Sequence, residues 1–201
     1  MTQELLTQIR NILHAEHQAS ADLIISHVQG PIVFLIDEYH NLTDLIRDNT
    51  AITGTLIRDF NVTLIAVEGI EGDHISRLDL MSPDPDRCFG VSRLATAMCG
   101  DNRAEVVGVD SLEMFKQIEK DCSEGKFTAA AHPNQESRSK HMLQSLAQKL
   151  NARPRVSAAI LTAGKRHVDD IETSLRAPGN QQDSATGPSF IRVRSRFLPV
   201  A

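Results

Sequence analysis

The chain is poor in aromatic residues and cysteine. It has no tryptophan and one tyrosine, and aromatic residues make up 4% of its 201 residues. Apolar cofactor pockets usually rely on aromatic side chains, so this composition argues against a haem pocket. The three cysteines, Cys88, Cys99 and Cys122, form no CxxC pair. A zinc knuckle or a disulfide framework is therefore not expected, and a reducing compartment such as the cytoplasm is favoured.

Several other signals are missing. No stretch approaches the ~20 apolar residues that a membrane span needs, and the N-terminus lacks the pattern of a signal peptide. The formal net charge of -5 gives no reason to expect a nucleic-acid partner. The motifs GxxxxGK[ST], GxGxxG and GxSxG are absent, so common nucleotide-binding and serine-hydrolase sites lack support.

What is present is ordinary for a globular chain, with 41% hydrophobic and 23% charged residues. That is enough to bury one core. The charge is uneven, because residues 1–100 carry 14 Asp/Glu and 6 Lys/Arg, while residues 101–201 carry 12 and 15. A site shared between the halves could therefore be mixed in sign. The expected partner is a small-molecule or peptide substrate.

Apolar periodicity predicts alternating helices and strands. Two helices are expected within residues 1–30, the second starting at Ser20 and ending before Gly30. Buried strands are expected at 32–37, 61–69, 103–110 and 155–164. Helices are expected at 43–60, 91–100, after a capping box at Asp110 and Glu113, at 136–150 and at 166–176. The prolines of 81–90 predict a loop.

This order predicts a single α/β domain, in which a largely parallel central sheet is flanked by helices. The N-terminal helices would occupy 1–30 and the core 31–177. A glycine-rich, flexible loop is expected at 178–189, and 190–197 alternates apolar and basic residues, as a half-exposed edge strand would.

Polar residues gather where the predicted strands end, which is where ligands bind in open α/β sheets. The first strand ends in Asp37, Glu38, Tyr39 and His40, and the second ends in Glu68. Glu38 and His40 would point the same way in extended chain. Asp37 is better explained as a turn or cap residue, and Asp110 as a helix cap.

Three later residues are further candidates. Glu68 follows an apolar run and needs a partner, which could be purely structural. Arg138 shares a helix stripe with two core positions and would point inward, although a surface arginine could show the same spacing. His167 starts a helix, where a neutral imidazole is favoured and could ligate a metal or accept a proton. A buried histidine without chemistry is the alternative.

Four motifs in order, "DEYH" (37–40), "VEG" (67–69), "ESRSKHM" (136–142) and "GKRH" (164–167), resemble those of the superfamily that contains the TraB, Tiki, ChaN and erythromycin-esterase-like proteins. They span about two thirds of the chain. The resemblance implies functional roles for a set of five residues: Glu38, His40, Glu68, Arg138 and His167.

The resemblance leaves the reaction open, because its members include metal-dependent proteases, metal-free esterases that use a histidine base, and haem-binding proteins. The chain also departs from the pattern. Asp37 replaces the first glycine, Ser139 replaces an asparagine, and Lys165 with Arg166 replace small residues. These two cations would oppose a nearby metal ion and would suit an anionic substrate.

The leading hypothesis is a hydrolase. In its metal-dependent form, Glu38, His40 and His167 bind Mn, Zn, Fe or Co, and Glu68 is a ligand or base. In its metal-free form, His40 is the general base. Arg138 would stabilise negative charge in either form. The alternatives are a binding protein for haem, with Tyr39 as the axial ligand, a binding protein for a small anion held by Lys165 and Arg166, or a relic that has lost activity.

Overall fold

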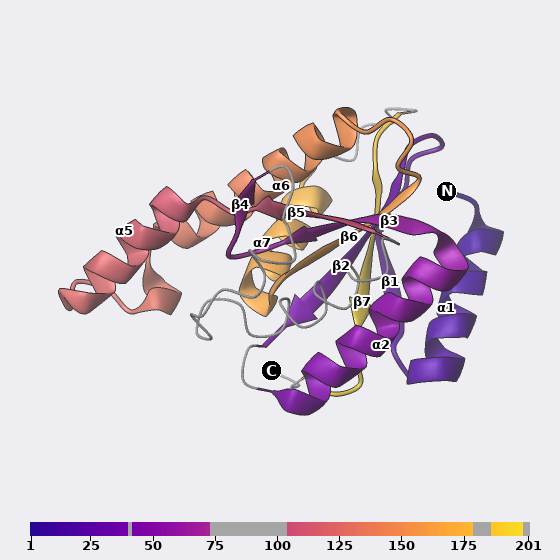
Figure 1. The fold of residues 1–201 in the computed structure, drawn as a ribbon, viewed down its shortest axis with the longest axis horizontal. Coiled ribbons are helices and arrows are strands. Elements are labelled where there is room, and N and C mark those ends of the chain that lie inside the picture. The colour runs from indigo at the N-terminus through magenta and orange to yellow at the C-terminus, as the bar shows by residue number, and fades with distance from the viewer. Residues whose placement is uncertain (40–41, 73–103, 179–185, 199–201) are drawn as a thin grey trace.

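A computed structural model describes residues 1–39, 42–72, 104–178 and 186–198. Figure 1 shows a central sheet with helices packed on both sides. In chain order the elements are α1 (Gln3–His17), β1 (Ser20–Ile25), β2 (Ile32–Glu38), α2 (Thr43–Phe60), β3 (Val62–Val67), β4 (Glu71–Gly72), β5 (Glu105–Val109), α5 (Leu112–Ser123), a short 3-10 helix (Ala129–Ala131), α6 (Asn134–Asn151), β6 (Ala158–Gly164), α7 (Lys165–Arg176) and β7 (Ser189–Arg194).

Within these residues the sheet has seven strands in the order β1-β7-β2-β6-β3-β5-β4. The five strands from β7 to β5 are parallel, and the outer strands β1 and β4 are antiparallel to their neighbours. The predicted single α/β domain with a largely parallel sheet is therefore confirmed. No helix in the described ranges has the length and apolar character that a membrane crossing requires.

Two apolar layers cover the sheet. Phe34 and Ile36 of β2 pack in the layer that contains α1 and α2, whereas Val33 and Leu35 pack in the layer that contains α6 and α7. Successive side chains of a strand alternate between its faces. Asp37 therefore continues the row that faces α6 and α7, and Glu38 continues the row that faces α1 and α2.

The helix predicted to begin at Ser20 is wrong. Gln18 adopts a left-handed conformation with φ 54° and ends α1, and residues from Ser20 onward form β1. β1 pairs with β7 over Ser20–Ile25, and Asp22 forms an ion pair with Arg194. Pairing with a distant strand thus overrides a local helical pattern that is only a few residues long.

The terminal strand is also different from its prediction. β7 lies between β1 and β2 instead of at an edge, and it is buried along most of its length. Its alternating basic residues suggested a solvated face. However, Arg192 is only 3% exposed, because acidic side chains surround its guanidinium.

The helix and loop predicted at 81–100 lie outside the described residues, as does most of the loop predicted at 178–189.

Gly108 on β5 allows a close backbone approach that positions the strand end. A Cβ at this position would lie 2.3 Å from the carbonyl oxygen of Ile70, and that oxygen also accepts a hydrogen bond from the N–H of Asp110 at 3.1 Å. The Gly108→Ala substitution should therefore lower the free energy of unfolding by about 1–3 kcal/mol, measured by urea denaturation. Gly54→Ala is the control, because its Cβ would meet nothing within 4 Å on helix α2. The Gly54→Ala substitution should raise the free energy of unfolding by up to about 1 kcal/mol. Equal effects of the two substitutions would contradict the close approach.

Candidate functional site

The carboxyl ends of four neighbouring strands bring together side chains that are distant in the sequence. Glu38 ends β2, Glu68 follows β3, Asp110 follows β5, and Gly164 ends β6, immediately before α7. In the sheet, Glu38 pairs in register with Gly164, and the N–H of Gly164 donates to Glu68 Oε2 at 2.6 Å. α6 adds Arg138 from the helical layer. The predicted position of the site is thus occupied by a connected polar cluster.

Arg138 is 3% exposed, and all three of its side-chain nitrogens have partners within this cluster. Its Nε donates to Asp110 Oδ1 at 3.1 Å, and one Nη2 hydrogen goes to Asp110 Oδ2. The other Nη2 hydrogen goes to Glu68 Oε1 at 3.3 Å. Nη1 donates to Gln135 Oε1 at 3.1 Å and reaches His167 Nε2 at 3.3 Å. Arg138 therefore holds four partners in place.

His167 has a partner on each ring nitrogen. Nε2 lies between Arg138 Nη1 and Glu68 Oε1, the latter at 3.4 Å. A neutral imidazole accepts at Nε2 from Arg138, and a protonated one donates from Nε2 to Glu68. Nδ1 lies 2.8 Å from the hydroxyl oxygen of Ser139. Either protonation state of His167 is consequently matched by a neighbouring group.

Glu68 is held in its charged form. Burial by itself opposes the charge, but His167, the N–H of Gly164 and Arg138 outweigh burial and lower the pKa of Glu68 to about 2. Glu68 is therefore a carboxylate at any physiological pH. The structure brings Glu68, Arg138 and His167 into direct contact, which agrees with their prediction as one cluster.

Asp110 was predicted to cap α5, and this prediction is wrong. The N-cap is Ser111, whose hydroxyl accepts a hydrogen bond from the N–H of Met114 at 3.4 Å. Asp110 is fully buried and instead binds Arg138 through both carboxylate oxygens, with additional N–H donors from Gly69 and Ser111. The sequence could not indicate this role, because the pair joins residues 28 positions apart.

Glu38 reaches the same edge from the other face of the sheet. No hydrogen bond or ion pair joins it to Glu68, Arg138 or His167 within the described ranges. Burial raises the pKa of Glu38 to about 7, with Thr162 acting in the opposite direction and the Glu68 charge adding to the increase. Glu38 Oε2 and Thr162 Oγ1 are buried, and neither has a hydrogen-bond partner of good geometry in the described part of the chain. Glu38 is thus a buried carboxyl group that has one unpaired oxygen in the described part of the chain and a pKa close to neutral pH.

Asp37 is not the turn or cap residue that was predicted. It lies within β2, is 2% exposed, and binds Arg192 of β7 through both oxygens, one of them at 2.9 Å from Nε. Arg192 also contacts Asp169 and Glu172 of α7, each at 2.7 Å. This second buried arginine cluster ties α7 to the sheet and was missed, because a basic residue in an alternating strand usually faces solvent.

The remaining predicted residues are dispersed. His40 lies outside the described residues. Tyr39 is 37% exposed. Lys165 begins α7 and pairs with Asp169 at 2.7 Å. Arg166 is exposed and lines a groove between α6 and α7, referred to below as the α6/α7 groove. Both cations therefore belong to α7, and His167 of the same helix contacts Glu68 and Arg138.

His132 is buried within the link between α5 and α6. Its Nδ1 accepts a hydrogen bond from the N–H of Asn134 at 3.1 Å, so its Nε2 carries the proton that faces Asp121 Oδ2, also at 3.1 Å. These contacts fix one tautomer and give His132 a structural role. No sequence signal distinguishes it from a surface histidine.

The predicted metal site includes His40, which lies outside the described residues, so the metal site stays a prediction. Both ring nitrogens of His167 have partners, and Arg138 Nη1 lies 3.3 Å from Nε2, where its positive charge would repel a cation. Across the described ranges, no group of three or more His, Cys, Asp or Glu side chains is placed to hold a metal ion.

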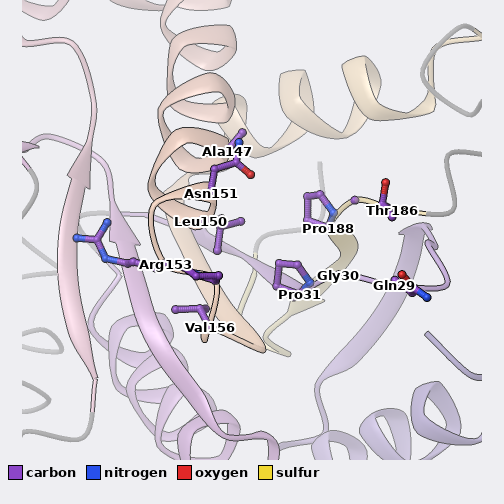
Figure 2. Close-up of a pocket in the computed structure, with 12 residues that line it drawn as sticks. Gln29, Gly30, Pro31, Ala147, Leu150, Asn151, Arg153, Val156, Thr186 and Pro188 are labelled. Carbon is purple, nitrogen blue, oxygen red and sulfur yellow. The ribbon is translucent and has the colours of Figure 1, made fainter.

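Two grooves adjoin the helical layer of α6 and α7. The α6/α7 groove has a volume of about 410 Å³ and includes Ser139 and Asp170 in its lining. The second has a volume of about 340 Å³ and lies at the amino ends of β2, β6 and β7. Figure 2 shows Pro31, Leu150, Val156 and Pro188 around this second groove, which is at the sheet edge opposite Glu68 and His167.

Comparison with protein-family models, curated proteins and solved structures found no match to this chain. The resemblance to the TraB, Tiki, ChaN and erythromycin-esterase-like proteins stays a prediction from four short motifs.

Removing one partner of the buried Asp37–Arg192 ion pair should destabilise the folded chain. The Asp37→Asn substitution leaves Arg192 with one fewer charged partner in a buried position, and we expect a loss of about 3–5 kcal/mol in the free energy of unfolding. Asp44→Asn is the control, because Asp44 forms an exposed pair with Arg47 at 3.6 Å. It should change stability by less than about 1 kcal/mol. Comparable losses in the two variants would contradict the assigned burial.

Glu38→Gln should change how stability depends on pH. The pKa of Glu38 is raised from 4.5 to about 7 in the folded chain, so folding retains a proton that the unfolded chain releases. The contribution of Glu38 to the free energy of unfolding therefore falls by up to about 3 kcal/mol as the pH rises from about 4.5 to about 7. Urea denaturation at pH 5 and pH 8 should show the variant gaining stability over the parent at pH 8 only. Exposed Glu4→Gln should show no such difference.

Proposed function

We propose that the chain is a hydrolase that uses acid–base chemistry of its own side chains at the carboxyl edge of the sheet. The main support comes from two carboxyl groups on either side of Gly164, those of Glu38 and Glu68. The pKa of Glu38 is raised to about 7, whereas the pKa of Glu68 is lowered to about 2. Such a division supplies one group that exchanges protons and one that remains charged.

Glu38 is the proposed general base. At and above pH 7 its carboxylate can take a proton from an attacking water molecule, and its buried Oε2 has no hydrogen-bond partner in the described part of the chain. His167 is the second proton-transfer group, because its imidazolium can return a proton to the leaving group. Glu68 stabilises that imidazolium from 3.4 Å.

Arg138 has a positioning role in this proposal. Four of its five donors are engaged with Asp110, Glu68 and Gln135, and the fifth faces His167 Nε2, so Arg138 orients the acid and the imidazole instead of binding an anionic intermediate. The alternative of a small-anion binding protein has less support for the same reason, since Lys165 also has an acidic partner.

A panel of carboxylic ester, thioester, amide and phosphoester substrates tests the proposal in the presence of a chelator. We expect turnover of one class by the parent chain, with a rate that rises with pH through about 7 as Glu38 loses its proton. Glu38→Gln and His167→Gln should each lose about 10²-fold or more in kcat. His14→Gln, an exposed position on α1, should retain full activity.

Two results would overturn this proposal. Full activity of Glu38→Gln would remove the proposed base, and an absence of turnover across the whole panel would remove the hydrolase assignment. Metal content measured by mass spectrometry provides a separate arm. Stoichiometric Mn, Zn, Fe or Co that is lost in His167→Gln would instead favour the metal-dependent form.

A further inference from the structure

Two unpaired oxygens, Glu38 Oε2 and Thr162 Oγ1, are buried on the sheet face that α1 and α2 cover. Thr162 is 1% exposed and pairs in register with Ile36 of β2, two residues before Glu38. Ile36 packs in the layer that contains α1 and α2, so Thr162 faces that layer as well. Within the described ranges, neither oxygen has a hydrogen-bond partner.

The hydroxyl of Thr162 lies close to the carboxyl group of Glu38. The two residues are diagonal neighbours on adjacent strands, a separation that a long side chain such as glutamate can reach across. Burial raises the pKa of Glu38, and the Thr162 hydroxyl opposes that rise, which places it near the carboxyl. However, the two groups do not form a hydrogen bond with each other. Buried unpaired oxygens are destabilising, and a polar atom in contact with both would satisfy them together.

The strand position beside Glu38 has room for a small group. Its register partner on β6 is Gly164, which has no side chain. A Cβ at Gly164 would lie 3.4 Å from Glu68 Oε2 and 4.0 Å from His167 Cδ2, and both are ordinary van der Waals separations. A group of the size of a methyl, which is also about the size of a water molecule, is therefore accommodated at this point of the sheet.

Helix α2 encloses the same part of the layer. Asn49 of α2 is 6% exposed, and its Nδ2 donates to the carbonyl oxygen of Asp37, the residue before Glu38, at 2.8 Å. The end of β2 is therefore covered by α2 and is shielded from bulk solvent on this face. An enclosed position with two unpaired oxygens suits one water molecule, because a buried water typically bonds to two to four polar groups.

We infer that Thr162 Oγ1 and Glu38 Oε2 bind one water molecule between β2 and β6, beneath α2. The binding follows from geometry alone, since water can donate to or accept from either oxygen. The use of this water rests on the proposed function, in which a water molecule in contact with Glu38 is the nucleophile. Thr162 is then a further residue of the site, which holds the water from a second direction and orients it before a substrate binds.

A crystal structure of the full chain, at a resolution that shows other buried water molecules, tests the binding directly. We expect density for one water within about 3.2 Å of both Glu38 Oε2 and Thr162 Oγ1. The density should persist in Thr162→Ser, which keeps the hydroxyl, and should be lost in Thr162→Val. Three results in the parent would overturn the inference: no density in contact with both oxygens, a direct hydrogen bond between them, or a metal ion recognised by its anomalous scattering.

Urea denaturation provides a second test. Thr162→Val keeps the shape of the side chain, but it leaves a bound water and Glu38 with one partner fewer, so the urea midpoint should fall. Without a bound water, the same substitution only removes an unpaired hydroxyl, and a midpoint that is unchanged or raised would overturn the inference. Thr53→Val is the matched control. The hydroxyl of Thr53 on α2 is buried and unpaired in the described part of the chain, but it is a single oxygen and lacks the second partner that a buried water needs. Its midpoint should not fall.

Neither measurement needs a substrate, so this inference and the proposed function can fail separately. A bound water with no turnover across the substrate panel would refute the proposed function and leave the water site standing. Turnover without a bound water would refute the water site only. Where both hold, Thr162→Val should lose about tenfold or more in kcat at an unchanged KM, and Thr162→Ser should restore the rate. An unchanged kcat in Thr162→Val would remove Thr162 from the reaction.

Discussion

The arrangement of the carboxyl edge depends on one buried guanidinium. Arg138 joins groups that follow β3 and β5 to groups on α6 and α7, and each of its three side-chain nitrogens has a partner. A buried charge is tolerated only when it is paired and hydrogen-bonded, so the acceptors are fixed as firmly as the arginine. The helix register of α6, the end of β5 and the ring of His167 are consequently coupled to one another.

The charge balance of this cluster explains why a histidine suits its position. Glu68 and Asp110 contribute two negative charges and Arg138 contributes one positive charge, so a neutral His167 leaves one carboxylate in excess. A proton on His167 would restore neutrality, but the nearby guanidinium opposes it. The imidazole thus lies between a donor, Arg138, and an acceptor, Glu68, and a ring nitrogen can bond to either neighbour.

The fold was predictable because the buried strands are continuous apolar runs, and the strand ends followed from the fold. Glu68, Arg138 and His167 were found because each lies at a strand end or on an inward helix stripe. The roles of Asp37, Asp110 and Arg192 were not predictable, since each depends on a partner far along the chain. Arg192 shows this most clearly, because its alternating neighbours are typical of an exposed strand while three acids bury it.

The separation of Glu38 from the arginine cluster follows from strand alternation and has a chemical consequence. Glu38 continues the β2 row that faces α1 and α2, whereas Arg138 and His167 belong to the helices on the opposite face. The sheet edge between them keeps the guanidinium from forming an ion pair with Glu38, which would have lowered the pKa of that carboxyl as it does for Glu68. Two acids near the same glycine thus acquire different protonation behaviour, because one is on each face of the sheet. A single face lined by both acids and Arg138 would hold two permanent carboxylates and no carboxyl group able to exchange a proton near neutral pH.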